Sequence, residues 1–107
     1  MHSAKNIKFD NILIKNNSSF DDMMHIIYSS NIQVINSNFL NAYKDAIDVD
    51  ISKNILFQNL KIKNSGNDGI DFMETAAQMH QVNILYSGDK AVSVGEKSKA
   101  IFDIIDI

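Results

Sequence analysis

The sequence predicts an all-β fold, a right-handed parallel β-helix, because it repeats itself every 22–25 residues and because apolar and polar residues alternate within each repeat. Asn31 follows Asn6 by 25 residues and Asn54 follows Asn31 by 23, and an isoleucine comes next in each case. A period of two is typical of strands, whose successive side chains point to opposite faces. The 107 residues therefore predict about four coils, each with three short strands.

Further asparagines keep the same register as the first column. They are Asn11, Asn36 and Asn59 in one column, and Asn16, Asn41 and Asn64 in another. Asparagine tolerates turn conformations, and stacked asparagines can hydrogen-bond to one another along the axis of a solenoid. We therefore interpret the asparagines as the bends of each coil and not as ligands.

The predicted core consists of apolar columns that run through successive coils, because a single coil cannot bury its own apolar face. The columns are Ile7, Ile32, Ile55 and Ala77; Phe9, Val34, Phe57 and Met79; Ile14, Phe39, Ile62 and Ile84; Met24, Ile47, Ile70 and Val92; and Ile26, Val49, Phe72 and Val94. A last partial coil, Ala100, Phe102, Ile105 and Ile107, continues the first columns.

One serine interrupts a further apolar column, and two glutamates are expected to form a column of their own. Ser37 falls in the column of Ile12, Leu60 and Val82, and we expect its hydroxyl to bond a backbone carbonyl. Glu74 and Glu96 are 22 residues apart and are expected to share one column.

The composition of the chain limits the kinds of partner and metal site that can be expected. A formal net charge of -3 with ten Lys+Arg provides no broad basic field, so neither nucleic acid nor a membrane surface is expected as a partner. Cysteine is absent, which excludes disulfides and thiolate metal sites. We expect residues 1–107 to form a single β-helix domain.

The expected solenoid begins and ends in mid-pattern, without a recognisable cap. Unpaired strand edges and an apolar cross-section normally require a cover. We therefore expect either an uncapped fragment of a longer chain, or end-to-end or edge self-association.

One phrase resembles a known superfamily. Residues 66–72, Gly-Asn-Asp-Gly-Ile-Asp-Phe, followed by residues 87–94, Ser-Gly-Asp-Lys-Ala-Val-Ser-Val, are similar to the parallel β-helix repeats of the pectin-lyase-like superfamily. Its members include pectate lyases, polygalacturonases, uronate-polymer epimerases, phage tailspikes and many bacterial surface proteins. The resemblance implies an extracellular or cell-surface location and a polysaccharide partner.

The resemblance also indicates catalytic counterparts. In the polygalacturonase pattern, aspartates act as general acid and base, and their counterparts here are Asp68 and Asp89. This sequence departs from the polygalacturonase pattern at Gly66, where that family has asparagine, and at Lys90, where that family has a second aspartate. Because inverting hydrolysis needs two carboxyl groups, Lys90 breaks the expected pair.

Alternation predicts an acidic outward face. If Ile47 and Ile70 point inward, then Asp48 and Asp71 point outward on one strand face, in line with His25 and Ser93. The preceding turn stacks four residues, Asp22, Asp45, Asp68 and Lys90. Asp45, Asp48, Asp68 and Asp71 could hold Ca²⁺, which prefers oxygen ligands, whereas the structural alternative is that turn aspartates accept backbone N–H bonds.

Three functions remain open from the sequence. The first is a carbohydrate-binding module that contacts polysaccharide through Asp45, Asp48, Asp71, Lys90 and the exposed ring of Tyr86, with no cofactor other than calcium. The second is a purely structural or surface solenoid. The third is a fragment of a polysaccharide lyase or glycoside hydrolase, not expected to be active in this form.

Overall fold

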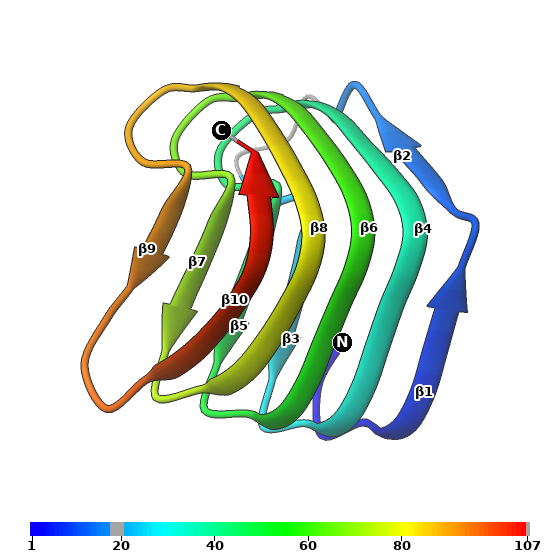
Figure 1. The fold of residues 1–107 in the computed structure, drawn as a ribbon, viewed down its shortest axis with the longest axis vertical. Helices are drawn as coiled ribbons and strands as arrows, with labels where there is room; N and C mark the ends of the chain where they lie inside the picture. Colours follow the sequence, from blue (N-terminus) through cyan, green and yellow to red (C-terminus); the bar gives the residue numbers. More distant parts are fainter. Residues whose placement is uncertain (18–20, 107) are drawn as a thin grey trace.

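The protein is a β-solenoid of two parallel sheets in a computed structural model that describes residues 1–17 and 21–106. The larger sheet contains β1 (Lys5–Asp10), β2 (Leu13–Lys15), β4 (Ser30–Ala42), β6 (Lys53–Ser65), β8 (Ala76–Ser87) and β10 (Lys99–Asp106). The smaller sheet contains β3 (Met24–Ile27), β5 (Ile47–Asp50), β7 (Ile70–Met73) and β9 (Val92–Val94). The chain alternates between the sheets, so that each coil adds one strand layer to both (Figure 1).

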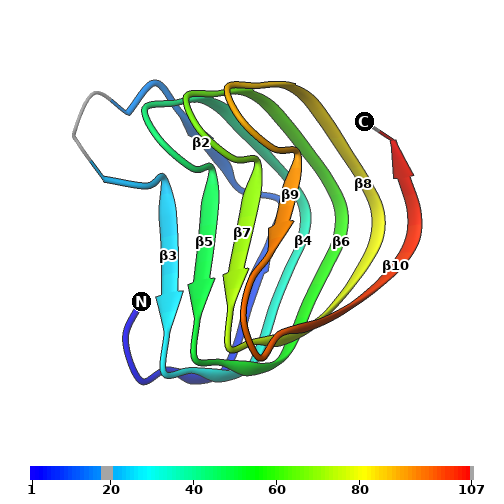
Figure 2. The same cartoon turned by 90° about the vertical axis from the view of Figure 1, so that its left-hand side faces the viewer.

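The view in Figure 2 shows β3, β5, β7 and β9 side by side in front of the larger sheet. All pairs in both sheets are parallel, which confirms the predicted parallel solenoid. One detail differs from the expected three strands per coil. In β4, β6 and β8 the first two expected strands run as one bent strand, whereas the first coil keeps β1 and β2 apart.

The predicted core columns are confirmed by the strand register. Ile7 pairs with Ile32, Ile32 with Ile55, and Ile55 with Ala77, and the other four columns align in the same way. In the middle coils these side chains are almost completely buried, and the aromatic rings of Phe57 and Phe72 stack across the core at a centroid distance of 6.1 Å. The core is therefore a set of apolar stacks enclosed by the two sheets.

The asparagine columns stand at the corners, as expected. All nine have a positive φ, between 51° and 61°, the left-handed region that asparagine tolerates better than other residues with a Cβ. Their amides form ladders from coil to coil: Asn31 donates to Asn6 (2.6 Å), Asn54 to Asn31 (3.2 Å), Asn59 to Asn36 (2.8 Å), Asn41 to Asn16 (2.6 Å) and Asn64 to Asn41 (2.9 Å). The column of Asn11, Asn36 and Asn59 differs in its first bond, because the Asn36 amide donates to Asp10 (3.1 Å) and not to Asn11.

Ser37 makes the predicted bond to a backbone carbonyl. Its hydroxyl donates to the carbonyl oxygen of Ile35 at 2.7 Å and accepts the N–H of Ile12 at 3.2 Å. Ile12 lies in the break between β1 and β2. The hydroxyl therefore satisfies an N–H in the coil below at the point where the two strands of that coil separate.

A second type of corner ladder was not predicted. Ser29, Ser52, Thr75 and Ser98 recur every 23 residues, and each hydroxyl donates to the carbonyl two residues earlier. Three of these hydroxyls also accept a backbone N–H from the coil below, namely Ser29 from Ala4, Ser52 from Ser29 and Ser98 from Thr75. This corner is therefore held by side-chain hydroxyls.

Glycine is required where two turns pack closely. A Cβ on Gly66 would lie 1.9 Å from the carbonyl oxygen of Tyr43, and one on Gly88 would lie 2.1 Å from that of Gly66. This close approach of backbone to backbone explains why Ser65-Gly66 recurs as Ser87-Gly88.

The prediction for Glu96 was wrong. Lys97, and not Glu96, shares the positive φ of Tyr28, Ile51 and Glu74, and Lys99 pairs with Ala76. The last coil contains one additional residue between Val94 and Lys97, which moves Glu96 out of the column.

The partial last coil continues the register. Ala100 pairs with Ala77, Phe102 with Met79 and Ile105 with Val82, as expected, while Ile107 lies outside the described residues. Among residues 1–17 and 21–106, no helix is long and apolar enough to cross a membrane.

Ile51 is a β-branched residue in the left-handed region, at a φ of 47°. Such a residue costs about 1–2 kcal/mol there, and asparagine costs less. We predict that Ile51→Asn raises the free energy of unfolding by about 1 kcal/mol, measured by urea denaturation. Met73→Asn is the control, because Met73 is an exposed apolar residue of the neighbouring coil with an ordinary φ, and a gain of the same size there would contradict the explanation.

Candidate functional site

The outward face of the smaller sheet carries a row of polar side chains, one from each strand. His25 on β3 pairs with Asp48 on β5, Asp48 with Asp71 on β7, and Asp71 with Ser93 on β9. The inward neighbours of Asp48, Ile47 and Val49, are fully buried. The alternation that placed these four residues on one outward face is therefore confirmed.

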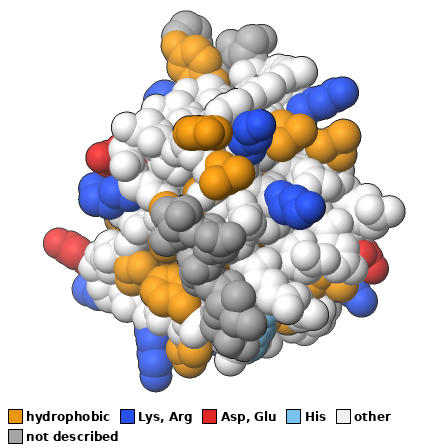
Figure 3. All heavy atoms as spheres, turned by 45° about the horizontal axis from the view of Figure 1, so that its top comes forward, with side chains coloured by type: hydrophobic (Ala, Val, Ile, Leu, Met, Phe, Trp, Pro, Cys, Tyr) orange, Lys and Arg blue, Asp and Glu red, His pale blue; other side chains and the backbone are white. Residues whose placement is uncertain are grey.

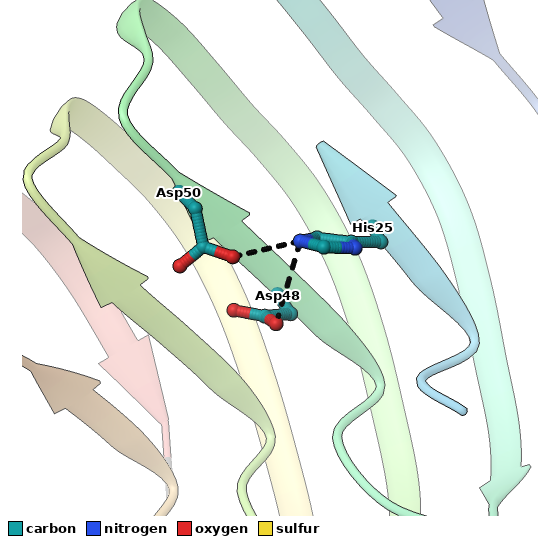
Figure 4. A group of neighbouring side chains, drawn as sticks. All are labelled: His25, Asp48 and Asp50. Atoms are coloured by element: carbon teal, nitrogen blue, oxygen red, sulfur yellow. Dashed lines mark hydrogen bonds and ion pairs between the residues drawn. The ribbon is translucent and has the colours of Figure 1, made fainter. Parts of the chain in front are cut away.

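Asp50 lies beside this row and was not predicted from the sequence. Its Oδ2 lies 2.7 Å from His25 Nε2, while Asp48 Oδ2 lies 3.6 Å from the same nitrogen (Figure 4). The signal was available, because Asp50 stands two residues after Asp48 and shares its face. The three side chains come from two successive coils, with His25 reaching across to the strand beside it.

The turn before this sheet contains an aspartate ladder. Asp22 Oδ1 accepts the N–H of Asp45 at 3.0 Å, Asp45 Oδ1 that of Asp68 at 2.8 Å, and Asp68 Oδ1 that of Lys90 at 3.0 Å. Asp45 also accepts the amide of Asn67 at 2.9 Å. The structural interpretation of the turn aspartates therefore holds for one oxygen of each carboxylate.

The four aspartates expected to hold calcium are divided between two groups and do not form one. Each group places one oxygen per residue within 4.8 Å of the others, and Asp45 belongs to both. The groups are Asp22, Asp45 and Asp48, and Asp45, Asp68 and Asp71. A third group, with an imidazole, consists of His25, Asp48 and Asp50.

Crowding of carboxylates changes their protonation. Burial raises the pKa of Asp48 to about 8, assisted by the negative charge of Asp50 and by a hydrogen bond and charge from Asp22. Burial, followed by the charge of Asp68, also raises the pKa of Asp71, and burial raises that of Asp45 against the hydrogen bonds it accepts. Asp48 is therefore largely protonated at pH 7.

The remaining predicted residues lie beside this face. Lys90 Nζ contacts Asp89 Oδ2 at 3.1 Å, and this hydrogen bond raises the pKa of Lys90. Tyr86 is 74% exposed, and it lines a shallow hollow with Asp89 at the corner that leads to β9. Asp68 is buried and held by the backbone, whereas Asp89 is exposed and paired with Lys90, so the two differ in surroundings.

Negative charge is not spread evenly over the molecule. The face in Figure 3 carries scattered lysines and hydrophobic side chains, and carboxylates are visible only near its edges. The acidic groups described above belong to the smaller sheet and to the turn before it.

Comparisons with known proteins bear on the fold. Residues 22–107 match the family model described as a right handed beta helix region. The crystal structure of the enzymatically active domain of tailspike protein 2 from bacteriophage CBA120 superposes with a TM-score of 0.80 and 16% identity. The match covers 94% of this chain and 17% of that chain. The comparison with curated protein sequences gave no match.

The raised pKa of Asp48 predicts a pH-dependent stability. The pKa of Asp48 in the folded state, about 8, lies above the ordinary 3.8, so the folded state binds the proton of Asp48 more tightly than the unfolded state does. The resulting stabilisation of the fold is complete below pH 4 and is lost as the pH rises toward 8. The amide of Asp48→Asn has no proton to lose over this range. We therefore predict that the free energy of unfolding of Asp48→Asn is about 2 kcal/mol higher than that of the wild type at pH 8.5 and similar to it at pH 4. Urea denaturation at both values measures this difference.

The control for this prediction is Glu96→Gln, which neutralises an exposed carboxylate on the last turn. It should leave the pH dependence of the wild type unchanged. Equal pH dependence in Asp48→Asn and the wild type would contradict the assignment of the effect to Asp48.

Proposed function

Because the chain belongs to the right-handed β-helix family, we propose that it is a carbohydrate-binding module that contacts polysaccharide along the outward face of β3, β5, β7 and β9. The observation that carries the proposal is the row of His25, Asp48, Asp71 and Ser93, which repeats a polar side chain on each successive coil. Neighbouring strands lie about 4.8 Å apart, so the row offers regularly spaced hydrogen-bonding groups to a chain molecule lying across the strands.

The protonation of the row suits sugar hydroxyls. Asp48 is largely protonated at pH 7 and can donate a hydrogen bond, whereas an ionised carboxylate only accepts. Ser93 can do both, and it hydrogen-bonds to Asp71. Hydroxyl groups are donors and acceptors at once, so neutral glycans match this face better than uronates, which the surrounding carboxylates would repel.

The neighbouring corner extends the proposed surface. Lys90 follows Asp68 in the turn ladder, and Tyr86 presents an exposed ring beside Asp89. An exposed aromatic ring can lie against the apolar face of a sugar, and an ammonium group can bind its oxygens. These residues would contact a glycan that continues past β9.

Two likenesses support a carbohydrate partner. The repeats resemble a superfamily that includes enzymes acting on uronate polymers, and the fold is similar to that of a domain from a phage tailspike. At 16% identity the second likeness concerns the fold, so the assignment of the face depends on the polar row.

The glycan proposal predicts a specific loss. Asp48→Ala and Asp71→Ala should each weaken binding of a glycan at least tenfold, because each removes a hydrogen-bonding group from the centre of the row, a change of about 1.4 kcal/mol. A panel of neutral and acidic polysaccharides, read by calorimetry, would identify the ligand, and product analysis of the same mixtures would detect turnover.

Glu96→Ala is the control, since it removes one exposed carboxylate outside the row. Absence of saturable binding to every glycan at millimolar concentration would reject the proposal. It would favour a purely structural solenoid, which the engagement of Asp22, Asp45 and Asp68 by the backbone also supports.

Calcium binding stays a prediction for this face. Asp45, Asp68 and Asp71 bring three carboxylate oxygens together, and Ca²⁺ takes oxygen ligands. We expect millimolar CaCl₂ to raise the unfolding temperature of the wild type and to have a smaller effect on Asp71→Asn, measured by thermal denaturation. Equal effects on both proteins would contradict it.

A further inference from the structure

His25, Asp48 and Asp50 form a group whose chemistry differs from that of the aspartate ladder. His25 Nε2 lies 2.7 Å from Asp50 Oδ2 and 3.6 Å from Asp48 Oδ2, and each of the three residues offers one ligand atom within 4.8 Å of those of the other two. The side chains of Asp48 and Asp50 are 17% and 16% exposed and that of His25 is 44% exposed. The group is therefore partly enclosed yet open to solvent on one side.

Within residues 1–17 and 21–106, no backbone N–H is hydrogen-bonded to the carboxylate of Asp48 or Asp50. Asp45 and Asp68 each accept the N–H of the following coil, whereas Asp50 Oδ2 is hydrogen-bonded to the imidazole of His25 and Asp48 is hydrogen-bonded to Asp22, another acid. The corner ladders are therefore complete without Asp48 and Asp50. The structural role that explains the turn aspartates does not extend to this pair.

The imidazole alone does not balance the charge. Metal binding releases the proton that Asp48 carries at pH 7, and a neutral imidazole with two ionised carboxylates then has a net charge of −2. No lysine in the described part of the chain forms an ion pair with Asp48 or Asp50. Asp22 and Asp71 add negative charge from both sides. A divalent cation would supply the missing positive charge.

The spacing of the three atoms fits a small divalent ion. Zinc binds nitrogen and carboxylate oxygen at about 2.0–2.2 Å, so two ligands of a tetrahedral ion lie about 3.3 Å apart. The measured separations from His25 Nε2, 2.7 and 3.6 Å, lie on either side of that value. To bind the ion, Asp50 Oδ2 would move slightly away from His25 Nε2 and Asp48 Oδ2 slightly toward it.

We propose that His25, Asp48 and Asp50 bind a divalent transition-metal ion, with Zn²⁺ as the test ion, through Nε2 of the imidazole and one oxygen of each carboxylate. Imidazole nitrogen selects for zinc and similar ions, whereas calcium prefers oxygen alone, so this site is distinct from the calcium group of Asp45, Asp68 and Asp71. Three protein ligands leave a fourth position for water or a small ligand. The proposal goes beyond carbohydrate binding and does not depend on it.

Titration of the full chain with ZnCl₂, followed by calorimetry, tests the site. We expect one saturable site in the wild type, at least tenfold weaker binding in His25→Gln and Asp50→Asn, and unchanged binding in His80→Gln. His80 is the matched control, since it is an imidazole on β8 of the other sheet. The unfolding temperature of each variant without metal shows whether it has kept its fold.

A second readout uses the wild type alone. In NMR spectra of the protein, the imidazole signals of His25 should change on addition of Zn²⁺ and those of His2 and His80 should not. Absence of binding up to 1 mM Zn²⁺, unchanged affinity in a folded His25→Gln, or changes confined to the other histidines would each overturn the proposal. Failure of the glycan titrations would leave this result unaffected.

Discussion

Each coil can stack on the one below only if its corners turn at equivalent residues. The left-handed backbone of Asn31, Asn36 and Asn41 sets three of these turns, and the amide ladders connect two of them to the asparagines of the preceding coil. A slip by one residue would reverse the facing of every side chain in a strand, so the corners also determine which residues reach the core. The hydroxyls of Ser29, Ser52 and Thr75 hold the fourth corner by bonds to the backbone.

The acidic face is a consequence of this register. Stacking places Asp48 directly beside Asp71, and the turn before them places Asp45 beside Asp22 and Asp68. Like charges one strand spacing apart are unfavourable unless something compensates. In the turn the backbone N–H groups offset part of the effect, and the pKa of Asp45 is still raised by burial. On the strand face burial, together with the charge of Asp50, raises the pKa of Asp48, and the imidazole of His25 contacts Asp50.

The stacking of the core was predictable because it repeats. Columns such as Ile32, Ile55 and Ala77 recur at nearly constant spacing, and period-two alternation assigns their facing. Repetition also placed Asp48 beside His25. Asp50 was missed because its column contains Ile27 and Met73, so no repeat of carboxylates draws attention to it.

Other features lie outside what spacing alone can determine. The predicted column of Glu96 was wrong because the last coil has one additional residue near Gly95. The repeat length does not show whether Glu96 comes before or after such an insertion. The hydroxyl ladder, in contrast, was missed although it could have been predicted from spacing, since Ser29, Ser52, Thr75 and Ser98 recur every 23 residues. The contact of His25 with both carboxylates depends on side-chain rotation, which the pattern of residues does not specify.

Differences in coil length fall at the corners. The stretch from Asn16 to Asp22 is two residues longer than the stretch from Asn41 to Asp45, and Asn54 has no equivalent between Ala76 and Ala77, which take the places of Lys53 and Ile55. Stacked core residues must stay in register, but a corner can gain or lose a residue while the columns on either side of it remain paired. An insertion at a corner that borders the smaller sheet therefore changes the loop beside the polar row without displacing the apolar columns of the interior.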